Sequence, residues 1–129
     1  MQLINLSTTR KDQLLEITHE VENLIDFESG FIYIYCPHTT AGLMINENAD
    51  PDVKHDIILS LNEQVKENSK FKHIEGNSTA HVKSALIGKF LQIAVEDYKL
   101  VLGKWDGIYF CEFDGPRKRK VLVKKLTRS

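Results

Sequence analysis

Histidines that could do chemistry gather in two segments of the chain. His73, Glu75 and His81 lie within nine residues of one another in FKHIEGNSTAHVKSALIG, and His38 follows an apolar run further upstream. Histidine titrates near neutral pH and is the commonest metal ligand in proteins. Zinc binds neutral imidazole and carboxylate groups, so these four side chains could together hold a metal. Their spacing is not a well-known zinc signature, and separate structural histidines are the alternative.

An acidic loop follows His38, in NENADPD, residues 46–52. Hard cations such as magnesium prefer oxygen ligands and often bridge to the phosphates of a substrate. Helix capping explains two of the carboxylates, because Asp50 and Asp52 flank a proline at the first helical position. Capping does not explain Glu47, which could be a general base, a metal ligand or a solvent-facing residue.

Two further segments suit an anion. In Asp114-Gly115-Pro116-Arg117, the planar guanidinium of Arg117 suits a carboxylate or phosphate, unless it pairs with Asp114 across the turn. The turn Gly76-Asn77-Ser78 opens a predicted helix, whose first N–H groups suit an anion. Simple capping of that helix by Asn77 or Ser78 is the alternative reading.

Apolar periodicity predicts many short strands and a few helices. We expect strands over residues 1–7, 13–17, 31–36, 41–46, 90–97, 98–103, 105–113 and 120–126. A first helix should run from a Thr18 cap to Phe27. A second should start at Asp50 and bury Val53, Ile57, Ile58, Leu61 and Val65. A third should end at Gly88 and turn Val82, Ala85 and Leu86 inward. Together, these strands and helices predict an α+β fold: an antiparallel two-sheet β-sandwich with inserted helices.

Composition narrows the class of protein. A chain of 129 residues with 42% apolar residues and net charge −1 predicts one domain, residues 1–129, without nucleic acid or membrane binding. There is no signal pattern or membrane-length apolar run, and Cys36 and Cys111 should be buried thiols, so we expect a cytoplasmic protein. No P-loop or Gly-rich fingerprint occurs, so we expect no nucleotide or flavin cofactor. His19 and His55 are interpreted as surface residues.

The last segment is strongly basic. No acidic residue follows Asp114, whereas seven basic residues do: Arg117, Lys118, Arg119, Lys120, Lys124, Lys125 and Arg128. Lysine and arginine on the solvent side of an edge strand prevent edge-to-edge pairing, so the run predicts an edge strand. Phosphate binding by part of the run is the alternative.

Three longer motifs, HTTAGLMINENADPDV, HIEGNSTAHVKSALIG and LVLGKWDGIYFCEFDGPRKRKV, resemble the YjbQ family over essentially the whole chain. Some members of that family are described as secondary thiamine-phosphate synthases. The resemblance implies a two-sheet α+β sandwich that forms a homotrimer, with sites that can form where subunits meet. One departure is Thr79, where the family often carries aspartate.

The resemblance also implies a reaction and a set of residues. The reaction couples a pyrimidine pyrophosphate to a thiazole phosphate and releases pyrophosphate. A divalent ion, zinc or magnesium, is a possible cofactor, and the partner is a phosphorylated small molecule. The implied catalytic residues are His38, His81 and Glu47. The implied substrate-binding residues are Asn48, Asn77 and Arg117. The implied metal ligands are His38, His73, His81, Glu75 and Asp50.

Two other functions fit the same residues. One is metal-assisted hydrolysis of a phosphorylated small molecule, with Glu47 or Glu75 as the base. The other is a non-catalytic trimer that binds a metal or a metabolite.

Overall fold

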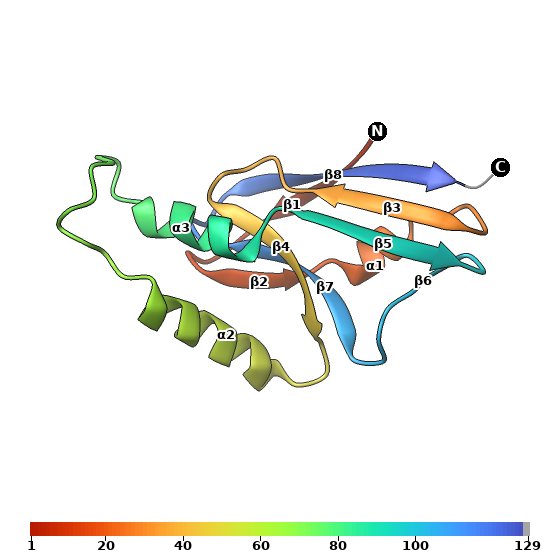
Figure 1. Ribbon diagram of the computed structural model, residues 1–129, viewed down its shortest axis with the longest axis horizontal. Coiled ribbons are helices and arrows are strands. Elements are labelled where there is room, and N and C mark those ends of the chain that lie inside the picture. Colours follow the sequence, from red (N-terminus) through yellow and green to blue (C-terminus); the bar gives the residue numbers. More distant parts are fainter. Residues whose placement is uncertain (128–129) are drawn as a thin grey trace.

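The computed structural model describes residues 1–127, which form two antiparallel β-sheets with helices packed on them (Figure 1). The larger sheet has the order β1-β8-β3-β5-β6, with bounds Gln2–Ser7, Lys118–Thr127, Gly30–Tyr35, Phe90–Glu96 and Lys99–Leu100. The smaller sheet has the order β2-β7-β4, with bounds Gln13–Glu16, Asp106–Glu112 and Ala41–Glu47. The helices are α1 Thr18–Glu22, α2 Pro51–Gln64 and α3 Ser78–Ile87. The predicted α+β class with two antiparallel sheets is confirmed.

The main core lies between the two sheets and follows from strand alternation. Ile32 and Ile34 of β3 are fully buried, and so are Ile108 and Phe110 of β7, which belongs to the other sheet. Successive side chains of a strand point to opposite faces, so alternate apolar residues meet in the core. Cys36 and Cys111 are buried as predicted, and burial raises the pKa of both thiols.

The basic strand β8 lies inside the larger sheet, so the predicted edge position is wrong. Leu122 of β8 pairs with Leu3 of β1 on one side and with Tyr35 of β3 on the other. The strand alternates, with Val121 and Val123 buried and its lysines mostly on the outer face of the sheet. An open sheet face solvates lysine as well as an edge does, and strand order cannot be read from alternation.

The helix starts agree only partly with prediction. At α2, the Asp50 side chain accepts a hydrogen bond from the Asp52 N–H at 2.9 Å, as expected of a cap. At α1, Thr18 lies inside the helix, which ends at Glu22 and not at Phe27. The Thr18 hydroxyl instead accepts from the Ile108 N–H at 2.8 Å, which ties α1 to β7.

The predicted face of α2 is the one that packs on the core, although it is only partly buried. On α2, Ile57, Ile58 and Leu61 are half-buried against the smaller core cluster, and Val65, which directly follows the helix, is buried. No residue within Pro51–Gln64 itself is fully buried.

The buried face of α3, in contrast, differs from the predicted one. On α3 the buried residues are Ala80, Lys83 and Ser84, whereas Val82 and Leu86 are exposed. Ser84 donates to the carbonyl of Ala41 at 2.6 Å, so a polar residue with a partner takes the inward position.

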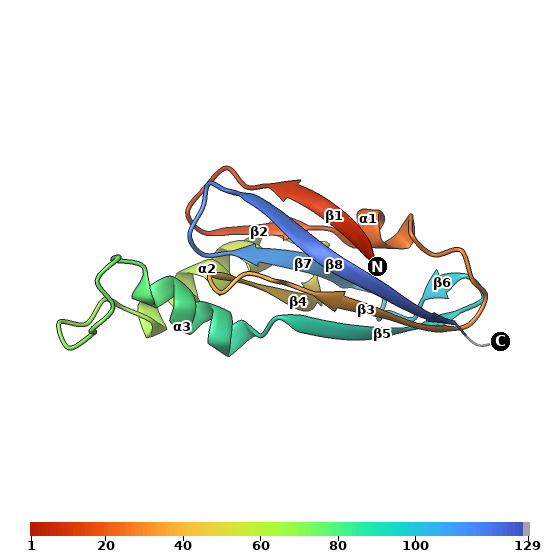
Figure 2. The ribbon, with the colours of Figure 1, turned by 90° about the horizontal axis from the view of Figure 1, so that it is seen from above.

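Lys83 joins three parts of the chain at the inner face of α3. Its ammonium group donates to Asp12 at 3.0 Å and also to Asn62 of α2. Figure 2 shows α2 and α3 together at one end of the molecule, with the connection 65–77 projecting beyond them. Among residues 1–127, no helix combines the length and the apolar character needed to cross a membrane.

Candidate functional site

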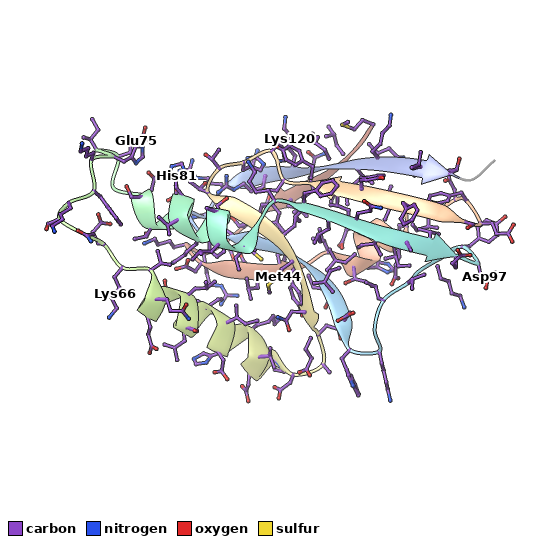
Figure 3. All side chains as sticks on the ribbon, viewed as in Figure 1. Met44, Lys66, Glu75, His81, Asp97 and Lys120 are labelled. Atoms are coloured by element: carbon purple, nitrogen blue, oxygen red, sulfur yellow. The ribbon has the colours of Figure 1, made fainter. Side chains whose placement is uncertain are left out.

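A pocket of ≈ 450 Å³ lies where the turn after β3, the loop before α3 and the β7–β8 turn meet. Figure 3 labels Glu75 and His81 at the end of the molecule where this pocket lies. The pocket brings together six of the predicted site residues, from segments far apart in the sequence: His38, His73, Glu75, Asn77, His81 and Arg117.

His73 and His81 form one wall of the pocket. Their ring centroids are 5.2 Å apart and the rings meet edge-on at 86°. His73 Nε2 lies 3.8 Å from the Glu75 carboxylate. His81 comes from the first turns of α3, and the other two side chains come from the exposed loop. Within residues 1–127, no three His, Cys, Asp or Glu side chains lie close enough to share a metal ion.

His38 is bonded to the main chain of β8. Its Nε2 accepts from the Lys120 N–H at 3.0 Å and lies 3.1 Å from the Lys120 carbonyl oxygen. Pro37 ends the β3–β8 ladder after the Tyr35–Leu122 pair, and the His38 ring takes the next place along β8. Burial and then the Arg119 charge lower the pKa of His38. The lowered pKa favours a neutral ring, and we assign its proton to Nδ1 because Nε2 then accepts from the Lys120 N–H.

A buried ion pair lies behind the pocket. Glu112 and Arg119 are 0% and 6% exposed. Oε1 of Glu112 accepts from the Thr8 hydroxyl and from Arg119 Nε, both at 2.8 Å. Oε2 accepts from Arg119 Nη2 and from the N–H groups of Phe113 and Asp114, at 3.1 and 3.0 Å for the last two. Burial alone would raise the pKa of Glu112, but these hydrogen bonds outweigh it and lower the pKa.

Sequence reasoning missed this pair. Arg119 Nη2 also donates to the Thr40 hydroxyl at 2.9 Å, and Arg119 lines the pocket together with Thr40. The alternation along β8 could have revealed it. Arg119, Val121 and Val123 are two residues apart, so their side chains point to the same, inner face of the sheet. A basic residue in that register needs a buried partner, and Glu112 occupies such a position on β7.

Arg117 pairs with Asp114, the alternative that the sequence left open. Nη2 of Arg117 donates to Asp114 Oδ2 at 2.8 Å, and the Arg117 side chain is half-exposed. Asn77 Nδ2 donates to the same oxygen at 2.9 Å, and within residues 1–127 Asn77 Oδ1 is buried without a partner. Burial would raise the pKa of Asp114, but the bonds from Asn77 and Arg117 outweigh it and lower the pKa.

Glu47, Asn48 and Asp50 lie elsewhere in the chain. Thr40 lines the pocket just before β4, and Glu47 is the last residue of this seven-residue strand. At about 3.3 Å per residue, β4 places Glu47 about 20 Å away from the pocket. Asn48 donates to Glu16 at 3.1 Å, and Asp50 caps α2. One chain therefore does not bring these three residues to the histidines.

Known proteins are similar to this chain in fold and in sequence. The chain is 46% identical to the UPF0047 protein YugU of Bacillus subtilis over 130 residues, 98% of each chain. It is 48% identical to a UPF0047 protein of Methanocaldococcus jannaschii over 122 residues, 92% of this chain and 88% of the relative. A crystal structure of a YjbQ/UPF0047 family protein from Clostridium acetobutylicum has a TM-score of 0.94 at 48% identity, covering 98% of this chain and 100% of that one.

A conserved hypothetical protein of Thermus thermophilus has a TM-score of 0.92 at 38% identity, covering 98% of this chain and 100% of that one. The sequence profile described as UPF0047 protein YjbQ-like matches residues 2–128. This chain therefore belongs to the YjbQ/UPF0047 family.

Proposed function

We propose that the pocket binds a phosphorylated small molecule and that the protein acts as a thiamine-phosphate synthase. In this reaction a pyrimidine pyrophosphate is coupled to a thiazole phosphate, and pyrophosphate leaves. One observation carries the proposal: three histidines and two arginines from distant segments converge on one pocket of ≈ 450 Å³. Such a group of donors suits a leaving group that gains negative charge in the transition state.

The proposed roles follow from the state of each side chain. When the carbon–oxygen bond to the diphosphate breaks, its electron pair leaves with the diphosphate, which needs donors and cations. Arg117 lies on the exposed side of the pocket and can turn from Asp114 to a phosphate. His81 can protonate the leaving group. The pKa of His38 is lowered by burial, and with Nε2 accepting from the Lys120 N–H its Nδ1–H can donate to the diphosphate.

Glu47, Asn48 and Asp50 enter this proposal as residues of a neighbouring copy in a homotrimer. The outer face of the larger sheet offers a surface for assembly, because Leu3, Leu122, Tyr35 and Phe90 form one cross-strand row. Phe90 at the end of this row is 54% exposed, and apolar surface of this kind often marks an interface. Light scattering of Phe90→Asp should show loss of the trimer, and an unchanged trimer would remove this face from the proposal.

We also propose that the site binds a divalent metal ion. His73, Glu75 and His81 supply the groups that zinc prefers, but their observed spacing does not form a ligand set within residues 1–127. No step above depends on a metal. Elemental analysis of protein purified without a nickel column should find about one metal ion per chain. A His73→Ala/His81→Ala variant should lack it, and equal metal content in both would contradict these ligands.

The deciding experiment is a two-substrate assay that follows thiamine phosphate and pyrophosphate. We expect His81→Ala to lose the activity, and His55→Ala, a matched change at an exposed histidine of α2, to keep it. If His81→Ala works at the wild-type rate, the role of His81 is wrong. Turnover of one phosphoester without a second substrate would indicate a hydrolase. Ligand binding without turnover would indicate a binding protein.

A further inference from the structure

Arg119 uses only one edge of its guanidinium inside the protein. Nε and Nη2 donate to Glu112, and Nη2 also donates to Thr40. No hydrogen bond among residues 1–127 uses Nη1. Arg119 is only 6% exposed, and it lines the pocket. The part of the guanidinium that remains accessible therefore faces the pocket.

The orientation of Arg119 is fixed before any ligand arrives. Glu112 has both oxygens occupied by donors from β8, from the chain before β2 and from the β7–β8 turn. Arginine loses much rotamer freedom when it binds a ligand, and that cost falls when the protein already holds the side chain. Arg117 differs, because its side chain is 51% exposed and its Nε and Nη2 are held by the single residue Asp114.

We infer that Arg119 binds one phosphoryl oxygen of the ligand through its Nη1 edge, and that Glu112 and Thr40 are its positioning residues. This inference rests on the proposal that the pocket takes a phosphorylated ligand. The ion pair is neutral as a whole, so Arg119 contributes a directed donor more than net charge. The group that it recognises is a phosphoryl group, whether on a pyrophosphate or on a phosphate monoester.

Nuclear magnetic resonance of wild-type protein with ¹⁵N-labelled arginine tests the contact without any change at the buried pair. Arg117→Lys removes one set of signals and so helps to assign those of Arg119. We expect inorganic pyrophosphate to shift the Arg119 guanidinium signals at concentrations that saturate binding. Saturation without a shift at Arg119 would overturn the inference, and so would the absence of any binding of pyrophosphate or inorganic phosphate.

Variants then separate the donor from its positioning residues. By calorimetry, Arg119→Lys should weaken pyrophosphate binding at least about tenfold, because a charge-assisted hydrogen bond with fixed geometry is lost. Thr40→Val leaves every charge in place and should weaken binding by about threefold, with broadened Arg119 signals. Thermal melting checks that each variant is folded, and if Arg119→Lys is not, the wild-type spectrum decides.

Glu112→Gln gives the sharpest contrast. The change adds net positive charge beside the pocket, so a purely electrostatic role predicts tighter pyrophosphate binding. The positioning role predicts weaker binding, because Arg119 loses its fixed orientation. Tighter binding would overturn this part of the inference. The probe is inorganic pyrophosphate, so the outcome is independent of the synthase assay. Protein that binds through Arg119 but makes no thiamine phosphate would refute only the proposed function.

Discussion

The two walls of the pocket are built in opposite ways. The wall formed by β7 and β8 contains Glu112 and Arg119, which are almost fully buried and bonded on nearly every polar atom. The other wall contains His73 and Glu75 of the loop 66–76, where every side chain is exposed and Ile74 reaches 96%. A buried charge requires a complete set of partners, whereas an exposed loop side chain requires none. Changes in the first wall should therefore alter the stability of the fold as well as ligand binding, and changes in the second should leave stability unaltered.

The largest expected effect is the loss of Glu112. Glu112→Ala leaves Arg119 buried without its carboxylate, and breaking a buried pair in this way costs about 3–5 kcal/mol of unfolding free energy. Urea denaturation of the variant and the wild type measures it. The control is Asp26→Ala, which breaks an ion pair between Lys125 and a carboxylate that is 76% exposed. An exposed ion pair contributes about 0–1 kcal/mol to the unfolding free energy. Similar losses of unfolding free energy in the two variants would contradict the difference between the buried and the exposed pair.

Much of the fold could be predicted from sequence at the level of single strands and helices. The alternating runs around Ile32 and Phe110 predicted β3 and β7, and the proline after Asp50 predicted the start of α2. The position of β8 could not be predicted, because alternation gives a strand its two faces but not its neighbours. The inward face of α3 was wrong for a related reason. Lys83 reads as a surface residue until Asp12, from another segment, provides its partner.

The second expected effect concerns pH and His38, which belongs to the turn between the two walls. The pKa of His38 is lowered by burial and by Arg119, so the unfolded chain binds this proton more readily than the folded one. His38 therefore contributes stability that is fully present above about pH 6.5 and is lost as pH falls through its folded-state pKa.

A ¹⁵N imidazole titration should place the pKa of His38 below the ordinary histidine value of about 6.5. The same spectra should show the proton on Nδ1 at neutral pH. His38→Asn should show a weaker fall of unfolding free energy between about pH 7 and 5 than the wild type shows. A midpoint at or above 6.5 would contradict the lowered pKa and the assigned neutral ring.

The site was predictable where chemistry is local in sequence. His73, Glu75 and His81 are near neighbours along the chain, and the structure places them on one pocket. Arg119 was missed because its role depends on Glu112 across the sheet and on Thr40 before β4. Nearness in sequence can also mislead. Glu47 lies close to His38 along the chain, but the whole of β4 separates them, and Glu47 therefore does not reach the pocket.

The smallest expected effect lies in the exposed wall. Ile74→Ser removes an apolar side chain that is 96% exposed and contacts little, so the unfolding free energy should change by less than about 0.5 kcal/mol. Urea denaturation under the conditions used for Glu112→Ala measures the change. A loss above about 1 kcal/mol would mean that Ile74 is covered in solution, as it would be under a neighbouring copy. In that case the loop 66–76 would not be an exposed wall. The wall formed by β7 and β8 would be held by its own chain, and the loop wall would be held by a neighbouring copy.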